Sequence, residues 1–224
     1  MSAAEGLAVI AGSDGDVGSA VVRRFVDAGW AVASLSREAR RSVPKATSLR
    51  ADLGDEAQVA GVVSRLAAHD PALRCVVNCA GYYERTARQA ENAAVRANNF
   101  RVAELLLKHF TPPLCDVDGA RFITVSSIDG RFLNTHSFAY SIDKAAINAL
   151  VGLYRKSHRS DRVNFDLILP GAINTRMRSD KEENKDVLIQ PEDIADICLF
   201  LSGCPSNVCF DDITIYPKSF SYAN

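Results

Sequence analysis

Apolar residues along the chain follow two alternating patterns. Short apolar runs rich in β-branched residues predict strands, and longer segments with apolar residues at three- and four-residue spacing predict helices. The predicted strands are 7–12, 31–36, 46–53, 74–81, 121–127, 164–171 and 213–217. The predicted helices are 17–29, 55–69, about 91–109, 139–158 and 191–203. Such alternation is typical of a parallel sheet that is covered by helices on both faces through right-handed crossovers.

The segment after the first predicted strand is rich in glycine. Gly12, Gly15 and Gly18 recur at every third residue, just before a predicted helix. Glycines allow a tight turn there and let a pyrophosphate approach the backbone, while the helix N-terminus offers free amide groups. The sequence therefore predicts a nucleotide-binding loop at the carboxyl end of this strand, where parallel sheets bind ligands. Asp14 and Asp16 add two carboxylates, and we expect Asp16 to be the helix N-cap.

A phenol and an amine stand four residues apart on the predicted helix 139–158. Residues at this spacing share one helix face, so Tyr140 and Lys144 can point into the same cleft. An ammonium group favours the ionised form of a neighbouring phenol, whose ordinary pKa is about 10, and the pair is therefore suited to proton transfer. Two fixed positions alone are more typical of a surface tyrosine and a solvated lysine on an amphipathic helix.

Length and charge limit the remaining possibilities. A chain of 224 residues with 47% hydrophobic residues can build one large core, so we expect a single domain over 1–224. The 26 basic and 27 acidic residues give a net charge of -1, which offers no general attraction to nucleic acid or to an anionic membrane. We find no secretory signal and no segment long enough to span a membrane, and we expect a cytoplasmic protein.

Cysteine usage predicts reduced thiols and no metal site. The six cysteines form no CxxC pair and stand near no histidine cluster. Cys75 and Cys79 fall in an apolar strand, where thiols usually pack as small hydrophobic groups.

Taken together, these motifs resemble those of a short-chain dehydrogenase/reductase over essentially the whole chain. Gly12, Gly15 and Gly18 fit the TGxxGxxG form of the family's glycine motif, with Ala11 in place of threonine. Asp16 stands where the commoner form has its middle glycine. The resemblance implies a Rossmann-type, doubly wound, seven-stranded parallel sheet with strand order 3-2-1-4-5-6-7.

Further segments match those that contact the adenine and nicotinamide ends of the cofactor in this family. Asp52 and Leu53 match the pair that faces adenine, residues 78–81 match the NNAG segment with Cys79 replacing its second asparagine, and residues 170–175 match the segment that holds the nicotinamide end. The cofactor-binding residues that the resemblance implies are Gly12, Ser13, Gly15, Val17, Gly18, Ser36, Arg37, Asp52, Leu53, Asn78, Ala80, Gly81, Tyr140, Lys144, Pro170, Gly171, Ile173 and Thr175.

The resemblance also implies a catalytic tetrad of Asn99, Ser127, Tyr140 and Lys144. Ser127 precedes Tyr140 by thirteen residues, which is the family's usual interval. By resemblance, Tyr140 exchanges the proton with the carbonyl oxygen, Ser127 stabilises that oxygen, Lys144 also holds the nicotinamide ribose and Asn99 orders a water. Asn98 is the competing assignment for the asparagine. Either Ser127 or Asn99 alone would also fit an ordinary strand-end serine or a polar helix residue.

The end of the second predicted strand bears on cofactor choice. Ser36 stands where NAD-preferring members carry an acidic residue, and Arg37 follows it. A guanidinium suits a 2′-phosphate, so NADP(H) is the preferred cofactor and NAD(H) remains possible. The alternative is that Arg37 is a solvated loop residue, like the neighbouring Arg40 and Arg41.

The predicted activity is that of an NADPH-dependent carbonyl reductase, in which hydride passes between nicotinamide and a ketone or aldehyde. Two alternatives are an alcohol dehydrogenase that uses NADP+ or NAD+, and a non-catalytic NADP(H)-binding regulatory module. We expect residues 128–139 and the loop after Thr175 to line the substrate space. Candidate lining residues are Phe132, Leu133, His136 and Phe138, with Tyr82 and Tyr83 near the mouth. Family likeness further predicts a homodimer or homotetramer.

Overall fold

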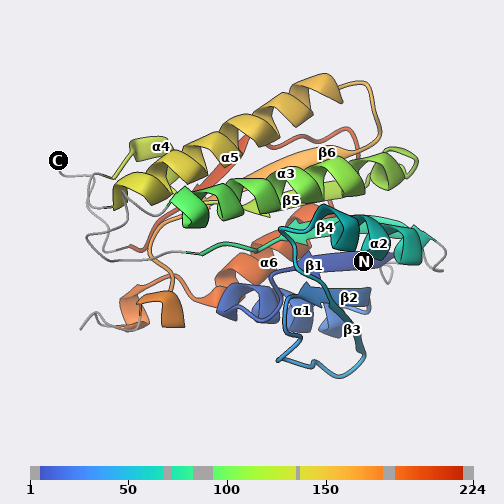
Figure 1. The fold of residues 1–224 in the computed structure, drawn as a ribbon, viewed down its shortest axis with the longest axis horizontal. Helices are drawn as coiled ribbons and strands as arrows, with labels where there is room; N and C mark the ends of the chain where they lie inside the picture. The colour runs from blue at the N-terminus through green and yellow to red at the C-terminus, as the bar shows by residue number, and fades with distance from the viewer. Residues whose placement is uncertain (1–5, 68–71, 83–92, 135–136, 179–184, 219–224) are drawn as a thin grey trace.

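A seven-stranded sheet forms the centre of the molecule. The computed structural model describes residues 6–67, 72–82, 93–134, 137–178 and 185–218. Every strand pair is parallel, and the order β3-β2-β1-β4-β5-β6-β7 confirms the predicted order (Figure 1). The strands are β1 (Leu7–Ala11), β2 (Ala31–Ser36), β3 (Ala46–Arg50), β4 (Leu73–Asn78), β5 (Arg121–Val125), β6 (Asn164–Pro170) and β7 (Asp212–Ile215).

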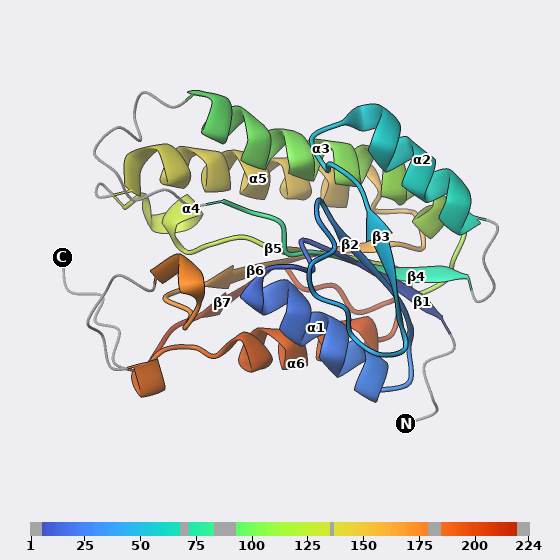
Figure 2. The ribbon, with the colours of Figure 1, turned by 60° about the horizontal axis from the view of Figure 1, so that its bottom comes forward.

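Helices cover both faces of this sheet. One face carries α1 and α6, and the other carries α2, α3 and α5 (Figure 2). The long helices are α1 (Asp16–Asp27), α2 (Glu56–Ala67), α3 (Ala93–Cys115), α5 (Phe138–Ser157) and α6 (Pro191–Ser202). The short ones are α4 (Asp129–Phe132), η3 (Arg176–Arg178) and η4 (Lys185–Val187). Among the described helices, none combines the length and the hydrophobicity that a bilayer crossing requires.

Alternation along the strands divides the core into two clusters. Val9 and Ile10 are neighbours on β1 and are both fully buried, yet their side chains enter opposite faces of the sheet. Val9 belongs to the cluster that includes Leu105 of α3, whereas Ile10 belongs to the cluster that includes Ile194 of α6. Burial on both faces explains why the strands read as continuous apolar runs.

Helix α3 extends beyond its predicted end at residue 109. It continues to Cys115 through Pro112 and Pro113, which cannot donate to the carbonyls of the preceding turn. Leu114 is fully buried in the core, and this packing outweighs the local loss of hydrogen bonds. The predicted start at residue 91 lies outside the described residues.

The N-terminus of α1 also differs from the prediction. Gly15 is the N-cap, with extended backbone angles, and Asp16 is the first helical residue. The Asp16 carboxylate is not at the N-cap position, and it accepts hydrogen bonds from Arg41 and Arg176. Asp16 therefore connects α1 to two loops that are distant in sequence.

Candidate functional site

The glycine-rich loop packs so tightly that side chains are excluded at two positions. Gly12 has a φ of 79°, and a Cβ added to it would lie 2.6 Å from the backbone nitrogen of Ala80 after β4. A Cβ on Gly18 would lie 2.2 Å from the Gly12 carbonyl oxygen. The loop after β1 therefore lies directly against the start of the segment after β4, and the N-terminus of α1 closes onto it.

Tyr140 and Lys144 come together on one face of α5. The Lys144 Nζ atom lies 5.4 Å from the centroid of the Tyr140 ring. Lys144 is 4% exposed, and a Cβ on Gly81 would lie 3.4 Å from its Nζ. Burial lowers the pKa of Lys144 from its ordinary value of 10.5 to about 8, although the charges of Asp143 and Cys79 act in the opposite direction. The Lys144 amine thus lies beside the Tyr140 ring and the segment that follows β4.

Ser127 lies after β5 in a loop that packs against α5. Its hydroxyl oxygen accepts a hydrogen bond from the Asp129 N–H at 3.1 Å, and Ile128 donates its N–H to the Pro170 carbonyl at 3.1 Å. A Cβ on Gly130 would lie 2.6 Å from the Lys144 carbonyl carbon. The ends of β5 and β6 are therefore fixed next to the helix that carries Tyr140.

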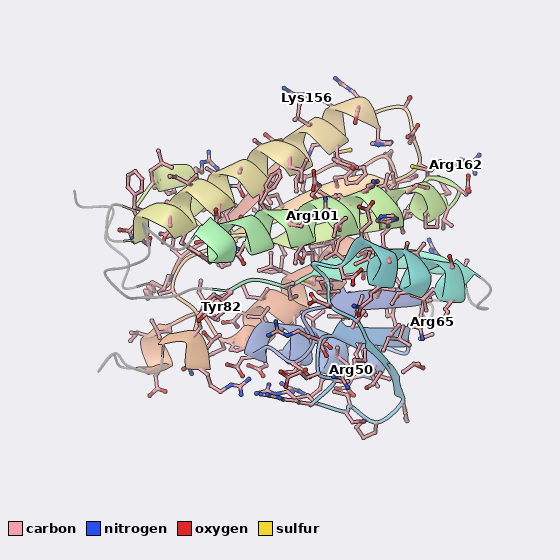
Figure 3. All side chains as sticks on the ribbon, in the orientation of Figure 1. Arg50, Arg65, Tyr82, Arg101, Lys156 and Arg162 are labelled. Atoms are coloured by element: carbon pink, nitrogen blue, oxygen red, sulfur yellow. The ribbon has the colours of Figure 1, made fainter. Side chains whose placement is uncertain are left out.

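Asn99 of α3 holds the segment that follows β4. Its side-chain oxygen accepts from the Tyr82 N–H at 2.8 Å, and its Nδ2 donates to the Tyr82 carbonyl at 2.9 Å. Figure 3 labels Tyr82 on this segment. The Asn99 side chain is thus used in positioning Tyr82, whereas the side chain of the competing Asn98 lies outside the described part of the chain.

The other predicted cofactor residues lie at the ends of parallel strands, and hence along one edge of the sheet. Asn78 ends β4, and its side-chain oxygen accepts from the Ala80 N–H at 3.0 Å. Gly171 follows β6 and donates to the Ile215 carbonyl at 2.8 Å. The remaining positions follow the same arrangement: Ser13 and Val17 in the loop and helix after β1, Ser36 and Arg37 at β2, Asp52 and Leu53 after β3, Gly81 after β4, and Pro170, Ile173 and Thr175 at β6.

Two arginines, Arg41 and Arg176, are part of the loop structure. The Arg176 Nε donates to an Asp16 carboxylate oxygen at 3.0 Å, and the Arg41 Nη2 donates to the same oxygen at 2.9 Å. Burial acts to raise the pKa of Asp16, but hydrogen bonds and charge from the two arginines outweigh it and lower the pKa. The signal in the sequence was the aspartate at a position where the family usually carries glycine.

Asp143 is a buried acid that the sequence reasoning missed. It is 6% exposed, and its Oδ2 lies 3.5 Å from the Asn99 Nδ2. Its charge acts to raise the pKa of Lys144. An acid on the inward face of an otherwise apolar helix is the signal that could have indicated it.

Large apolar side chains are exposed beside this edge of the sheet. Phe132, Leu133 and Phe138 are each more than half exposed. Leu133 has a φ of 54°, which is uncommon for a branched residue and stores backbone strain. His136 and Tyr83 lie outside the described residues, so their predicted place near the substrate stays a prediction.

A second cluster of polar side chains lies at the far end of α5. Cys115, His158 and Asp161 have ligand atoms within 4.8 Å of one another, although their sequence spacing predicted no such group. The His158 Nδ1 and the Asp161 Oδ2 are 2.6 Å apart and form an ion pair when the imidazole is protonated. Cys115, at the end of α3, donates from Sγ to the Asp161 Oδ2 at 3.6 Å, so hydrogen bonds among the three side chains account for this arrangement.

A sequence profile described as short chain dehydrogenase matches residues 6–186. The chain belongs to this family. The bovine dehydrogenase/reductase SDR family member 11 is 24% identical, over 94% of this chain and 95% of that protein. The cis-4-hydroxycyclohexanecarboxylate dehydrogenase of Sinomonas cyclohexanicum is 26% identical, over 89% of this chain and 90% of that protein. An uncharacterized oxidoreductase of Staphylococcus saprophyticus is matched over only 45% of its length.

Solved structures show the same fold as this short-chain dehydrogenase. The closed form of serine dehydrogenase complexed with NADP+ aligns with a TM-score of 0.86 and 18% identity, covering 97% of each chain. Together with the family profile, this likeness makes the protein a short-chain oxidoreductase of Rossmann-like fold.

Proposed function

We propose that this short-chain dehydrogenase is an NADPH-dependent carbonyl reductase that also runs in reverse as an alcohol dehydrogenase. Its substrates are ketones or aldehydes and the corresponding alcohols, and Tyr140 is the proton donor. The observation that carries the proposal is the 5.4 Å approach of the Lys144 Nζ to the Tyr140 ring, beside the glycine-rich loop and the exit of β4.

The residues at the sheet edge fit a nicotinamide dinucleotide. Gly12 and Gly18 leave no room for side chains and so present backbone to a pyrophosphate, while the N-terminus of α1 offers amide groups to it. Asn78, Gly81 and the segment from Pro170 to Thr175 would line the rest of the cofactor. When bound, the nicotinamide supplies or accepts the hydride.

The chain's own residues would handle the proton and the substrate oxygen. Lys144 in its charged form favours phenolate at Tyr140, so the phenol can donate and recover a proton near neutral pH. The Ser127 hydroxyl would donate to the substrate oxygen and stabilise its developing charge. Asn99 would order a water molecule in the proton relay. The two hydrogen bonds between its side chain and the Tyr82 backbone hold Asn99 in place.

Cofactor preference is argued from the end of β2. Ser36 supplies no carboxylate to grip a ribose 2′-hydroxyl, and the exposed Arg37 is free to turn toward a 2′-phosphate. We therefore propose NADP(H) as the preferred cofactor, with NAD(H) accepted. The related fold of serine dehydrogenase was solved with NADP+, which is consistent with this choice.

The test is oxidation of NADPH and NADH with a panel of ketones, aldehydes and quinones. The panel includes cyclic ketones, because one relative is a cis-4-hydroxycyclohexanecarboxylate dehydrogenase. We expect turnover with NADPH, and we expect Tyr140→Phe to lower kcat by about 100-fold to 10,000-fold while NADPH affinity is retained. Binding of NADPH with no turnover of any substrate, unchanged by Tyr140→Phe, would instead indicate the regulatory module.

A further inference from the structure

The loop after β2 has the construction of an anion site. Ala39 has a φ of 50°, so its backbone turns into the left-handed region that residues with a side chain seldom adopt. Successive N–H groups around such a residue converge on one point and form a concavity that binds anions. The Ala39 N–H donates to the Ser36 hydroxyl oxygen at 3.0 Å, and Arg50 of β3 donates from Nε to the Arg37 carbonyl at 3.0 Å (Figure 3). Both bonds hold the loop in shape.

The occupant of this concavity is a carboxylate from the glycine-rich loop. The Arg41 N–H donates to the Asp14 Oδ1 at 2.9 Å, and the Arg40 N–H and the Ser36 hydroxyl are further donors that act to lower the pKa of this carboxylate. Burial acts to raise the pKa of Asp14, but these donors and the charge of Arg40 outweigh it and lower the pKa. The carboxylate is therefore ionised at neutral pH.

In dinucleotide-binding folds of this topology, the residues at the end of β2 meet the 2′ position of the adenosine ribose. We infer that Asp14 fills, from within the chain, the anion site that a 2′-phosphate of NADP(H) would otherwise take, and that it limits the preference for NADP(H) over NAD(H). The inference rests on the proposed function, because it requires a nicotinamide dinucleotide at this edge of the sheet.

The competition follows from charge and from hydrogen-bond donors. A 2′-phosphate brings two negative charges to the loop and needs the same N–H groups that Asp14 already uses. NADP(H) must therefore displace Asp14 or bind beside it against like-charge repulsion, whereas the neutral 2′-hydroxyl of NAD(H) meets neither obstacle. Asp14 is thus a specificity-determining residue for the cofactor. It disfavours the 2′-phosphate, whereas Arg37 favours it.

The test measures binding alone, by calorimetry with NADPH, NADH, 2′,5′-ADP and 5′-AMP. The last two differ only in the 2′-phosphate and need no turnover. We expect Asp14→Asn and Asp14→Ser to tighten NADPH and 2′,5′-ADP by about 10-fold or more, since one charge-assisted hydrogen bond corresponds to at least that factor. NADH and 5′-AMP should stay within about 2-fold on the same scale.

Asp27→Asn is the matched control. Asp27 is exposed at the far end of α1, so this variant makes the same change in net charge without touching the loop and should leave all four affinities unchanged. Asp14→Asn keeps the size of the side chain, and circular dichroism checks that each variant is folded.

The remaining outcomes separate this inference from the proposed function. Unchanged or weaker NADPH binding in both Asp14 variants overturns the inference, as does a loss of NADH affinity, which would mean that Asp14 holds the ribose hydroxyl. If the unmodified protein binds neither NADPH nor NADH, the proposed function itself is wrong.

Discussion

At the scale of single residues, burial of Lys144 makes the chemistry and the stability of the fold depend on pH. Its pKa of about 8 lies below the ordinary value of 10.5 because burial disfavours the charged form. Around pH 7 the ammonium is still present and can favour phenolate at Tyr140. Above pH 8 this charge is progressively lost, so the proton-donor pair has an upper pH limit set by the lysine.

The sign of the effect on stability follows from linkage. Between about pH 8 and 10.5 the unfolded chain binds more protons at Lys144 than the native protein does, so the lysine's contribution to the free energy of unfolding rises with pH. We expect Lys144→Met to remove this rise. Relative to the variant, the unmodified protein should gain roughly 2–3 kcal/mol between pH 7 and pH 10 at 1.36 kcal/mol per pKa unit. Urea unfolding of both proteins at the two pH values checks this, and a constant difference would contradict it.

A second residue-scale feature is the buried ion pair between Arg121 and Asp166. Arg121 donates to both carboxylate oxygens at 3.0 and 2.9 Å and also to the carbonyls of Pro205 and Val208, and it joins β5 and β6 to the loop before β7. Both side chains are essentially excluded from solvent. Each charge therefore depends on the other for compensation.

Replacing one partner of this ion pair should lower the free energy of unfolding more than replacing both. We expect Asp166→Asn to lower the free energy of unfolding by about 3–5 kcal/mol, because it leaves an uncompensated guanidinium in the core. The double change Arg121→Met with Asp166→Leu should cost less than Asp166→Asn alone. Urea denaturation of the three proteins measures this, and a double variant less stable than Asp166→Asn would show that the bonds to Pro205 and Val208 dominate.

At the scale of elements, the contact between β1, its loop and α1 depends on the absence of side chains. Gly18 lies in the first turn of α1, where an added Cβ would lie 2.2 Å from the Gly12 carbonyl oxygen, so the helix starts close to the loop after β1. An added methyl group must push the helix away from the loop. The same displacement would move the amide groups that are proposed to bind pyrophosphate.

Gly18→Ala should therefore reduce cofactor affinity by about 10-fold or more, with an overpacking cost of about 1–3 kcal/mol in stability. Gly61→Ala is the matched control, because Gly61 lies within α2 and an added Cβ there would meet nothing within 4 Å. That variant should be more stable by about 0.5–1 kcal/mol from helix propensity alone. Calorimetric NADPH titration and thermal unfolding report the two effects; equal affinities in both variants would contradict the role of Gly18.

At the scale of the whole molecule, α5 presents apolar side chains to solvent on its outer surface. Leu153 is 63% exposed, Phe138 is 63% exposed and Ile142 is 37% exposed, although the same helix buries Ile147 and Val151 in the core. Two apolar faces on one helix suit a helix that packs both inward and against a second copy of the chain. We propose on this basis, and from the family resemblance, that α5 pairs across a dimer.

Leu153→Asp should weaken such a dimer, because it places a charge within the apolar contact. We expect light scattering after size-exclusion chromatography to give a dimer or tetramer for the unmodified protein and a smaller species for the variant. Circular dichroism should be unchanged, since Leu153 does not belong to the core. An unmodified protein that is monomeric, or a variant of unchanged mass, would contradict the proposal.

Across the whole molecule, the predictions from sequence are confirmed where a local pattern sufficed. Buried strands in a parallel sheet are short apolar runs, and helices between them carry a 3.6-residue period, so all seven strands and the five long helices were predicted. Predictions of helix ends failed where contacts with residues distant in sequence determine the structure. Helix α3 continues past two prolines to Cys115, where Leu114 is buried in the core, and Asp16 is the first helical residue and binds Arg41 and Arg176.

The sequence by itself determined the order of strands and helices along the chain and the residues that follow each strand. This was possible because hydrophobic period and glycine spacing are local properties. It also put Tyr140 and Lys144 on one helix face. Only the tertiary structure decided what the charged side chains contact. Asp14, Asp16, Arg41, Asp143 and Arg176 find partners between 25 and 160 residues away, where distance and desolvation rather than sequence spacing set the interaction.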